Sequence, residues 1–467
     1  MTQRFMDLRG KQRRSFLKWC TAAAATLGLE RSGMLNVLSE TAGVAAADAL
    51  TLNMRRFIGM VAGNGGFAWF QLLWPHLDVA KGTDPNYAFH ALGQAIPATN
   101  TTKPFMYAPD SPFQKLGPNW QISAFMAGNN ETHTATPISA ASLASGVGMF
   151  SGIAADQKQR LSTLIPVVAS DRMRLSYQSA DNAPPLAVVP NSDGVVQLFS
   201  SAASQRLLAK ADDARLYEAT YKAFSSLAVS QKCNRDLTGF RTGQVASNVL
   251  GNNFADRLTM GPDDMARYGL VGAPGDLVAF GKDLWMALRL FQYDLSGMYL
   301  MTAFNNDPHG AFAAGDTMPA THTKIMGQIF NAFQADAASI PDPSAPGLTL
   351  ADNIVFTASG DTPKNPLQRM GWPDGTPQNS NWVYVMGNGY LKTGWFGGVR
   401  ADGKVDGWDP ATGENVVGQS STVTANAAAA AAYYAVTCGQ GDIVNATRGS
   451  VANISGVTHK NPQGKGT

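Results

Sequence analysis

The stretch NIVFTA (Asn353–Ala358) decides the fold, because it is a short, almost continuous apolar run that ends in a turn at SGD, Ser359–Asp361. A run of this length without polar alternation is typical of a strand that is buried on both faces, as parallel strands are in α/β proteins. Three further runs have the same character, and they are Phe57–Ala62, Leu164–Ala169 and Ser296–Phe304. The sequence therefore predicts several neighbouring strands of one parallel sheet.

Helical patterns lie between these runs and after them. Apolar residues recur at helical spacing in Ala203–Val229, Leu277–Leu295 and Thr317–Ala338, and the alanine-rich run Ala425–Ala435 is also typical of a packed helix. Strands that alternate with long helices are the signature of βαβ units. The predicted fold class is α/β, with a mostly parallel sheet flanked by helices and long loops at the carboxyl ends of the strands.

Two long regions are rich in Gly, Pro and Asn and are predicted as loop insertions, at about residues 83–131, which could instead form a small subdomain, and 359–419. The second contains four tryptophans, which are Trp372, Trp382, Trp395 and Trp408. Exposed aromatic surface is costly unless it packs or binds. Two hypotheses follow: the tryptophans pin the loop to the domain, or Trp372 or Trp382 stays exposed as a platform for a sugar or a partner protein.

The N-terminal segment Met1–Ala47 has the features of a twin-arginine export signal. Arg13 and Arg14 stand in QRRSFLK (residues 12–18), a weakly apolar run follows at Trp19–Leu29, and small residues gather at 42–47, where a signal peptidase could cut. The competing interpretation is an amphipathic N-terminal helix of the mature protein. The signal predicts recognition of Arg13 and Arg14 by the twin-arginine translocation machinery, removal by signal peptidase, and a periplasmic or secreted bacterial protein. The apolar run is too short for a permanent membrane span.

Charge and cysteine content narrow the classes of function. The full chain has a formal charge of +2, and only 15% of its residues are charged. The segment before Asp48 holds seven Lys or Arg and three acids, so the mature chain is near 2 − 4 = −2. It has no basic run, which argues against nucleic-acid binding. Cys233 and Cys438 remain after cleavage, and the sequence leaves open whether they pair. Residues 48–460 are expected to form one domain, followed by a frayed tail at 461–467.

Two segments that follow predicted strands carry candidate metal ligands. Asp307 and His309 come after the strand predicted at Ser296–Phe304, and Asp361 comes after NIVFTA. Ligand groups in open α/β sheets lie at the carboxyl ends of strands. Carboxylates and an imidazole at one such edge can hold a divalent metal ion, which is the cofactor expected here. The alternatives are an Asp-Pro turn with an exposed histidine, and an aspartate in a glycine turn.

Two weaker candidates for binding a ligand or partner are Asn64 and His133. Asn64 stands in the turn GNGG (63–66) after Phe57–Ala62, where exposed N–H groups could form an anion nest, although a plain tight turn gives the same pattern. His133 stands in NNETHTAT (129–136), where hydroxyl groups lie beside an imidazole. The chain has no G-x-S-x-G elbow, no Walker loop and no H-E-x-x-H motif.

The order of these parts resembles a large exported bacterial family of unknown function with an alkaline-phosphatase/sulfatase-like fold. Asp307 and His309 match the family's Asp-x-His, and KTGWFG at 392–397 matches its Lys-x-Gly-x-x-Gly turn. The family's Asp-His-Gly segment falls near Gly375–Trp382, which has no carboxylate or imidazole, and Asn64 stands where an aspartate is usual. The resemblance implies a metal site at Asp307, His309 and Asp361 that has lost part of its ligand set.

Two classes of function follow from this resemblance. The first is a non-catalytic protein of the cell envelope that binds a glycan or an envelope protein. The second is a periplasmic metal-dependent hydrolase of phosphate or sulfate esters, which requires several Asp and His ligands around one or two divalent ions. The incomplete ligand set favours the first.

Overall fold

The computed structural model describes the chain from Met54 onward, with gaps. The described residues are 54–62, 96–107, 111–117, 119–129, 142–144, 147–161, 163–170, 177, 183–199, 254–302, 318–345, 347–360, 380–387, 389–400, 404–418, 422–439, 441 and 453–460. The predicted signal at 1–47 with Arg13 and Arg14, the predicted helix Ala203–Val229 and the tail at 461–467 lie outside them.

The core of the fold is an eight-stranded sheet with the order β12-β4-β11-β10-β1-β9-β7-β8. Its parallel half is made of β10 (Ile354–Gly360), β1 (Arg56–Ala62), β9 (Ser296–Thr302), β7 (Ile165–Ser170) and β8 (Ala187–Val189). Each strand in this half pairs in parallel with the next. The first four are the strands that the apolar runs predict, and they are neighbours in the sheet, so that prediction is confirmed.

The other half of the sheet comes from regions that the sequence analysis predicts as loops. β4 (Gln121–Asn129) lies inside 83–131, and β11 (Ser380–Gly387) and β12 (Gly394–Phe396) lie inside 359–419. β11 pairs antiparallel with both β10 and β4, whereas β12 pairs in parallel with β4. Within the described sheet, β11 alone runs against the other strands. The loop prediction is wrong here because Gly, Pro and Asn dominate these regions as a whole and conceal short apolar runs.

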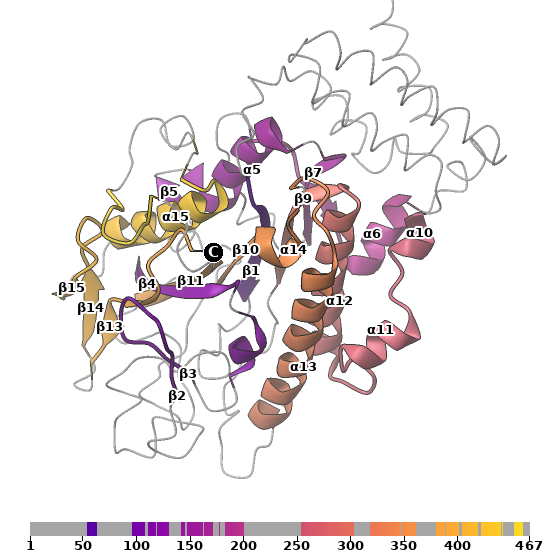
Figure 1. The fold of residues 1–467 in the computed structure, drawn as a ribbon, viewed down its shortest axis with the longest axis horizontal. Helices are drawn as coiled ribbons and strands as arrows, with labels where there is room; N and C mark the ends of the chain where they lie inside the picture. Colours follow the sequence, from indigo (N-terminus) through magenta and orange to yellow (C-terminus); the bar gives the residue numbers. More distant parts are fainter. Residues whose placement is uncertain are drawn as a thin grey trace, which may run out of the picture.

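Helices cover both faces of the sheet (Figure 1). Phe333 of α13 (Met318–Ser339) packs on Phe356, whereas Phe150 of α5 (Met149–Arg160) packs on Phe57. Phe57 pairs with Val355, the residue before Phe356, and successive strand residues point to opposite faces. The helices α5 and α13 therefore lie on opposite faces.

A second helix joins each of these layers. α12 (Gly275–Gln292) runs beside α13, and α15 (Thr422–Val436) is joined to α5 by a hydrogen bond from the Tyr433 hydroxyl to Asp156, 2.7 Å long (Figure 1). The helices predicted at Leu277–Leu295, Thr317–Ala338 and Ala425–Ala435 are confirmed as α12, α13 and α15. Ala427–Ala432 are almost fully buried, and their small side chains let α15 pack closely on the sheet.

Shorter elements complete the described fold. They are β2 (Ile96–Pro97), β3 (Met106–Tyr107), η3 (Pro112–Lys115), β5 (Ser142–Ala144), β6 (Val147–Gly148), α6 (Ser192–Phe199), α10 (Phe254–Arg257), α11 (Pro262–Arg267), α14 (Leu350–Asn353), β13 (Gly398–Val399), β14 (Val405–Trp408) and β15 (Asn415–Val417). The strands β13, β14 and β15 form a small antiparallel sheet. The whole is an α/β fold with a mostly parallel central sheet, consistent with an alkaline-phosphatase-like architecture.

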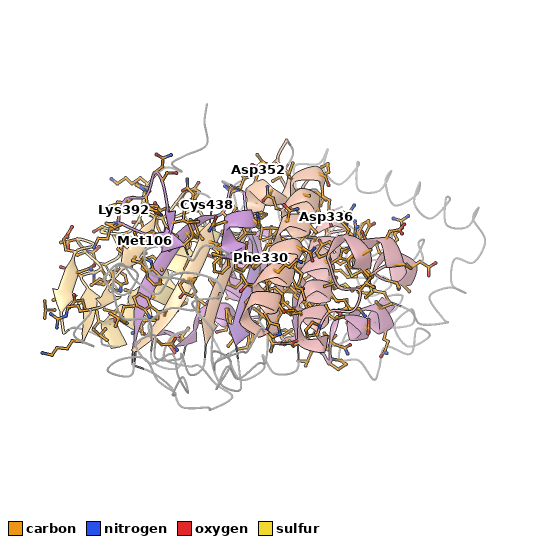
Figure 2. The ribbon with its side chains drawn as sticks, turned by 90° about the horizontal axis from the view of Figure 1, so that it is seen from below. Met106, Phe330, Asp336, Asp352, Lys392 and Cys438 are labelled. Atoms are coloured by element: carbon orange, nitrogen blue, oxygen red, sulfur yellow. The ribbon has the colours of Figure 1, made fainter. Side chains whose placement is uncertain are left out.

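The parallel strands run in one direction, so all of them begin on one side of the sheet and end on the opposite side. These two sides are called here the amino edge and the carboxyl edge. Figure 2 shows Asp352, Cys438 and Lys392 along one of them. Asp352 precedes β10, Lys392 precedes β12, and the backbone N–H of Arg55, just before β1, donates to the carbonyl oxygen of Val436 at 2.8 Å. This is the amino edge of the parallel strands. The carboxyl edge, where β1, β9 and β10 end, lies on the opposite side of the sheet.

Candidate functional site

The carboxyl edge of the sheet brings three strand ends together. β1 lies between β9 and β10, with Val61 paired to Thr302 of β9 and Ala62 paired to Gly360 of β10. The three strands therefore end at the same level. Neighbouring strands lie about 4.8 Å apart, so the outer two of the three are separated by about 10 Å.

Each of these strands leads into a segment that carries a candidate ligand. Asp307 and His309 follow the end of β9, Asn64 follows the end of β1, and Asp361 is the residue after the last of β10. All four side chains lie outside the described residues. The described strands confirm that each segment begins at the carboxyl edge.

His133 follows β4, which runs in the same direction as β10 and β1. Its side chain also lies outside the described residues. β4 is separated from β10 by the antiparallel strand β11. The strand order therefore places the end of β4 farther along the same edge, away from the neighbouring ends of β9, β1 and β10.

Two buried polar side chains, a hydroxyl and an amide, are described at this edge on β10 and β11. Ser359, the second-last residue of β10, is 1% exposed, and Asn381, the second residue of β11, is fully buried. The Asn381 side-chain oxygen accepts the backbone N–H of Trp382 at 2.7 Å. The Ser359 hydroxyl has no hydrogen-bond partner within the described part of the chain. Among the described residues, no group of three His, Cys, Asp or Glu could hold a metal ion.

The tryptophans of the region 359–419 are buried wherever the structure describes them. Trp382 is 1% exposed, Trp395 is 4% exposed and Trp408 is fully buried. The rings of Trp382 and Trp395 meet edge to face at 4.6 Å, and the Trp408 indole N–H donates to the carbonyl oxygen of Met126 at 2.9 Å. The hypothesis that Trp382 is an exposed platform is therefore wrong, because the ring packs inside the domain. Trp372 lies outside the described residues.

A buried ion cluster lies at the amino edge, and the sequence analysis does not predict it. Arg56, the first residue of β1, is fully buried, and its guanidinium group donates to Asp342 at 2.8 Å and to Asp294. The Asp342 carboxylate also accepts hydrogen bonds from Asn353 and Ser344. The position of an arginine directly before a buried strand is the signal that could have pointed to such a cluster, because a buried cation needs an acid beside it.

The charge of Asp342 depends on this cluster. Burial by itself would raise the pKa of the Asp342 carboxyl, but the charge of Arg56 and hydrogen bonds from Arg56, Asn353 and Ser344 outweigh it and leave the pKa lowered. The cluster joins the start of β1 to two other segments of the chain. Asp294 lies just before β9, and Asp342 lies just after α13. Its residues satisfy one another, which is typical of a structural network.

The described cysteine is Cys438, which is a free and buried thiol just after α15. Cys233 lies outside the described residues. Burial raises the pKa of the Cys438 thiol, although the charge of Arg55 and a hydrogen bond with Tyr390 act in the opposite direction. A buried thiol with a raised pKa is not poised for nucleophilic chemistry.

Among the helices that the structure describes, none is long and apolar enough to cross a membrane. Comparison of the chain with protein-family models, with curated proteins and with solved structures found no match.

Proposed function

We propose that this chain is an exported binding protein of the bacterial cell envelope with an alkaline-phosphatase-like fold and no hydrolase activity. Asp307, His309 and Asp361 hold one divalent cation at the carboxyl edge. The observation that supports the proposal is the strand order β9-β1-β10, because it places the starting points of the segments with these three residues about 10 Å apart at one edge. Asp361 directly follows Gly360, the last residue of β10. Asp307 is five residues beyond Thr302, the last residue of β9.

The number of acidic ligands favours binding over hydrolysis. Four adjacent strands reach this edge. β9, β1 and β10 end there, and the antiparallel strand β11 begins there at Ser380, beside β10. The candidate carboxylates and imidazole follow β9 and β10, whereas the turn directly after β1 carries Asn64 and the approach to β11 is uncharged from Gly375 onward. One ion with open coordination positions can accept oxygen atoms of a ligand, such as the hydroxyl groups of a glycan. Ester hydrolysis in this superfamily relies on a fuller ligand set.

The metal content of the processed protein tests this proposal. Protein purified without chelator should contain about one equivalent of a divalent metal, and Asp307→Asn, His309→Ala and Asp361→Asn should each lose most of it, because three protein ligands are about the minimum for tight binding. The matched control is Asp263→Asn, since Asp263 is an exposed acid on α11 that should not affect the metal content. The wild-type protein should not turn over p-nitrophenyl phosphate or p-nitrophenyl sulfate.

Two results would count against the proposal. Metal content that is unchanged in all three variants would remove the site. Metal-dependent turnover of either ester that is lost in Asp307→Asn would favour the other function, a periplasmic metal-dependent phosphate or sulfate ester hydrolase.

The export part of the proposal makes a separate prediction. Replacing Arg13 and Arg14 together with lysine should leave the precursor in the cytoplasm with Met1 still attached, because the arginine pair is the recognised feature of this signal. Cell fractionation and N-terminal mass spectrometry of the double variant check this. Normal export and cleavage of the double variant would contradict it.

A further inference from the structure

Two hydroxyl groups on β10 have no hydrogen-bond partner within the part of the protein that the structure describes. They belong to Thr357 and Ser359, and each of these residues is 1% exposed. A buried hydroxyl group that forms no hydrogen bond destabilises the fold, because it has given up its bonds with water. Buried polar groups are normally paired, so the two exceptions need a physical explanation.

The residues beside these hydroxyl groups do not supply the missing bonds. Paired residues of neighbouring strands point to the same face of a sheet, so the partners in register are the lateral neighbours of Thr357 and Ser359. All four partners lack a polar side chain, and they are Gly59 and Val61 on β1 and Val385 and Val383 on β11. The two hydroxyl groups therefore lie in an apolar part of the sheet.

The face of β10 that carries both hydroxyl groups is the face covered by α5. Strand residues alternate between faces, so Val355, Thr357 and Ser359 share one face. Val355 pairs with Phe57, and Phe150 of α5 packs on Phe57. Both hydroxyl groups thus lie between the sheet and its helix layer.

The two hydroxyl groups differ in their distance from the carboxyl edge. Ser359 is the second-last residue of β10 and pairs with Val61, which also pairs with Thr302, the last residue of β9. Thr302 is half-buried, so the surface is reached at this level of the sheet. Thr357 lies two residues deeper, which is about 7 Å along a strand. The preference of β-branched residues for strands accounts for Thr357, whereas it gives no reason for a serine.

We propose that Ser359 is a positioning residue for the divalent cation at the carboxyl edge, and that its hydroxyl group donates a hydrogen bond to an oxygen atom that coordinates this cation. Because this role requires a cation at the edge, it depends on the proposed function. Ser359 stands two residues before Asp361, so their Cα atoms are at most about 7 Å apart. A hydrogen bond to a metal-bound oxygen orients that oxygen and strengthens metal binding.

The variants Ser359→Ala and Thr357→Val form a matched pair. Each replaces a buried hydroxyl group without a described partner by an apolar group, so each should leave the metal-free protein at least as stable as wild type in urea unfolding. A metal-free Ser359→Ala protein that unfolds at lower urea than wild type would show that the hydroxyl group already has a structural partner. That result would overturn the proposal.

Metal affinity separates the two variants. Calorimetric titration of the metal-free protein with Zn²⁺, and separately with Mn²⁺, measures the Kd. Ser359→Ala should weaken binding about ten- to a hundred-fold, which is the usual effect of losing a hydrogen bond to a metal ligand. Thr357→Val should bind as tightly as wild type, because its hydroxyl group lies deeper in the sheet.

The outcomes distinguish this inference from the proposed function. Equal metal affinity in wild type and Ser359→Ala would overturn the role of Ser359 and leave the cation site standing. Equal weakening in Ser359→Ala and Thr357→Val would also overturn it, because the loss would then come from the packing of β10. Wild-type protein that binds neither metal would overturn the proposed function and the role of Ser359 with it.

Discussion

Replacing Arg56 with methionine should lower the free energy of unfolding by about 3–5 kcal/mol, because removal of one partner leaves an uncompensated buried charge. The side chains of Arg56 and Asp342 are both fully buried, so no water is at hand to replace the lost guanidinium group. Asp294 is 23% exposed and can be hydrated, so the penalty should fall mainly on Asp342. Urea unfolding at about pH 7 measures the loss.

A second variant separates the lost charge from the lost packing. Arg56→Met combined with Asp342→Asn removes both charges, and the asparagine can still accept hydrogen bonds from Ser344. The double variant should recover part of the stability that the single variant loses. A double variant less stable than Arg56→Met would show that the cluster acts through packing alone.

Trp408→Ala should cost about 3–5 kcal/mol of stability, because a fully buried indole is replaced by a cavity. The ring contacts Phe125 and Phe396 at 5.2 and 6.0 Å between ring centroids, which fastens the small sheet β13-β14-β15 to β4. Trp408→Phe should lose less, since it keeps an aromatic ring and gives up the hydrogen bond to Met126. Val417→Ala on β15 is the control, because Val417 is 70% exposed and its loss should change stability by less than about 0.5 kcal/mol.

Thermal and urea unfolding compare these three variants. A Trp408→Ala protein as stable as the Val417→Ala control would contradict the interpretation that the tryptophans pin this region. The remaining tryptophan of the region is Trp372, which lies outside the described residues. That Trp372 is a platform for a sugar or a partner protein therefore stays a prediction.

Half of the central sheet could be predicted from local sequence, and the other half could not, for a physical reason. β1, β7, β9 and β10 are buried on both faces and read as continuous apolar runs. β4 contains Ser123 and Gly128 inside its run and lies in a Pro- and Asn-rich region, so composition hides it. Its partner β11 is more than 250 residues away in the sequence, and pairing over such a distance leaves no local pattern.

The approximate place of the candidate site could also be predicted from the sequence, but the packing of the side chains near it could not. Strand ends are visible in the sequence, and they point to the segments with Asp307, His309 and Asp361. The burial of Trp382 could not be predicted from the sequence, because its packing partner Trp395 belongs to another strand.

Anomalous diffraction from crystals of the processed protein grown with a divalent transition metal tests the central claim most directly. The claim predicts one strong anomalous peak at the carboxyl edge of β9, β1 and β10, with oxygen or nitrogen atoms of Asp307, His309 and Asp361 about 2.0–2.3 Å from it. A peak elsewhere, or Asp307 and Asp361 on opposite faces of the sheet with no ion between them, would contradict it.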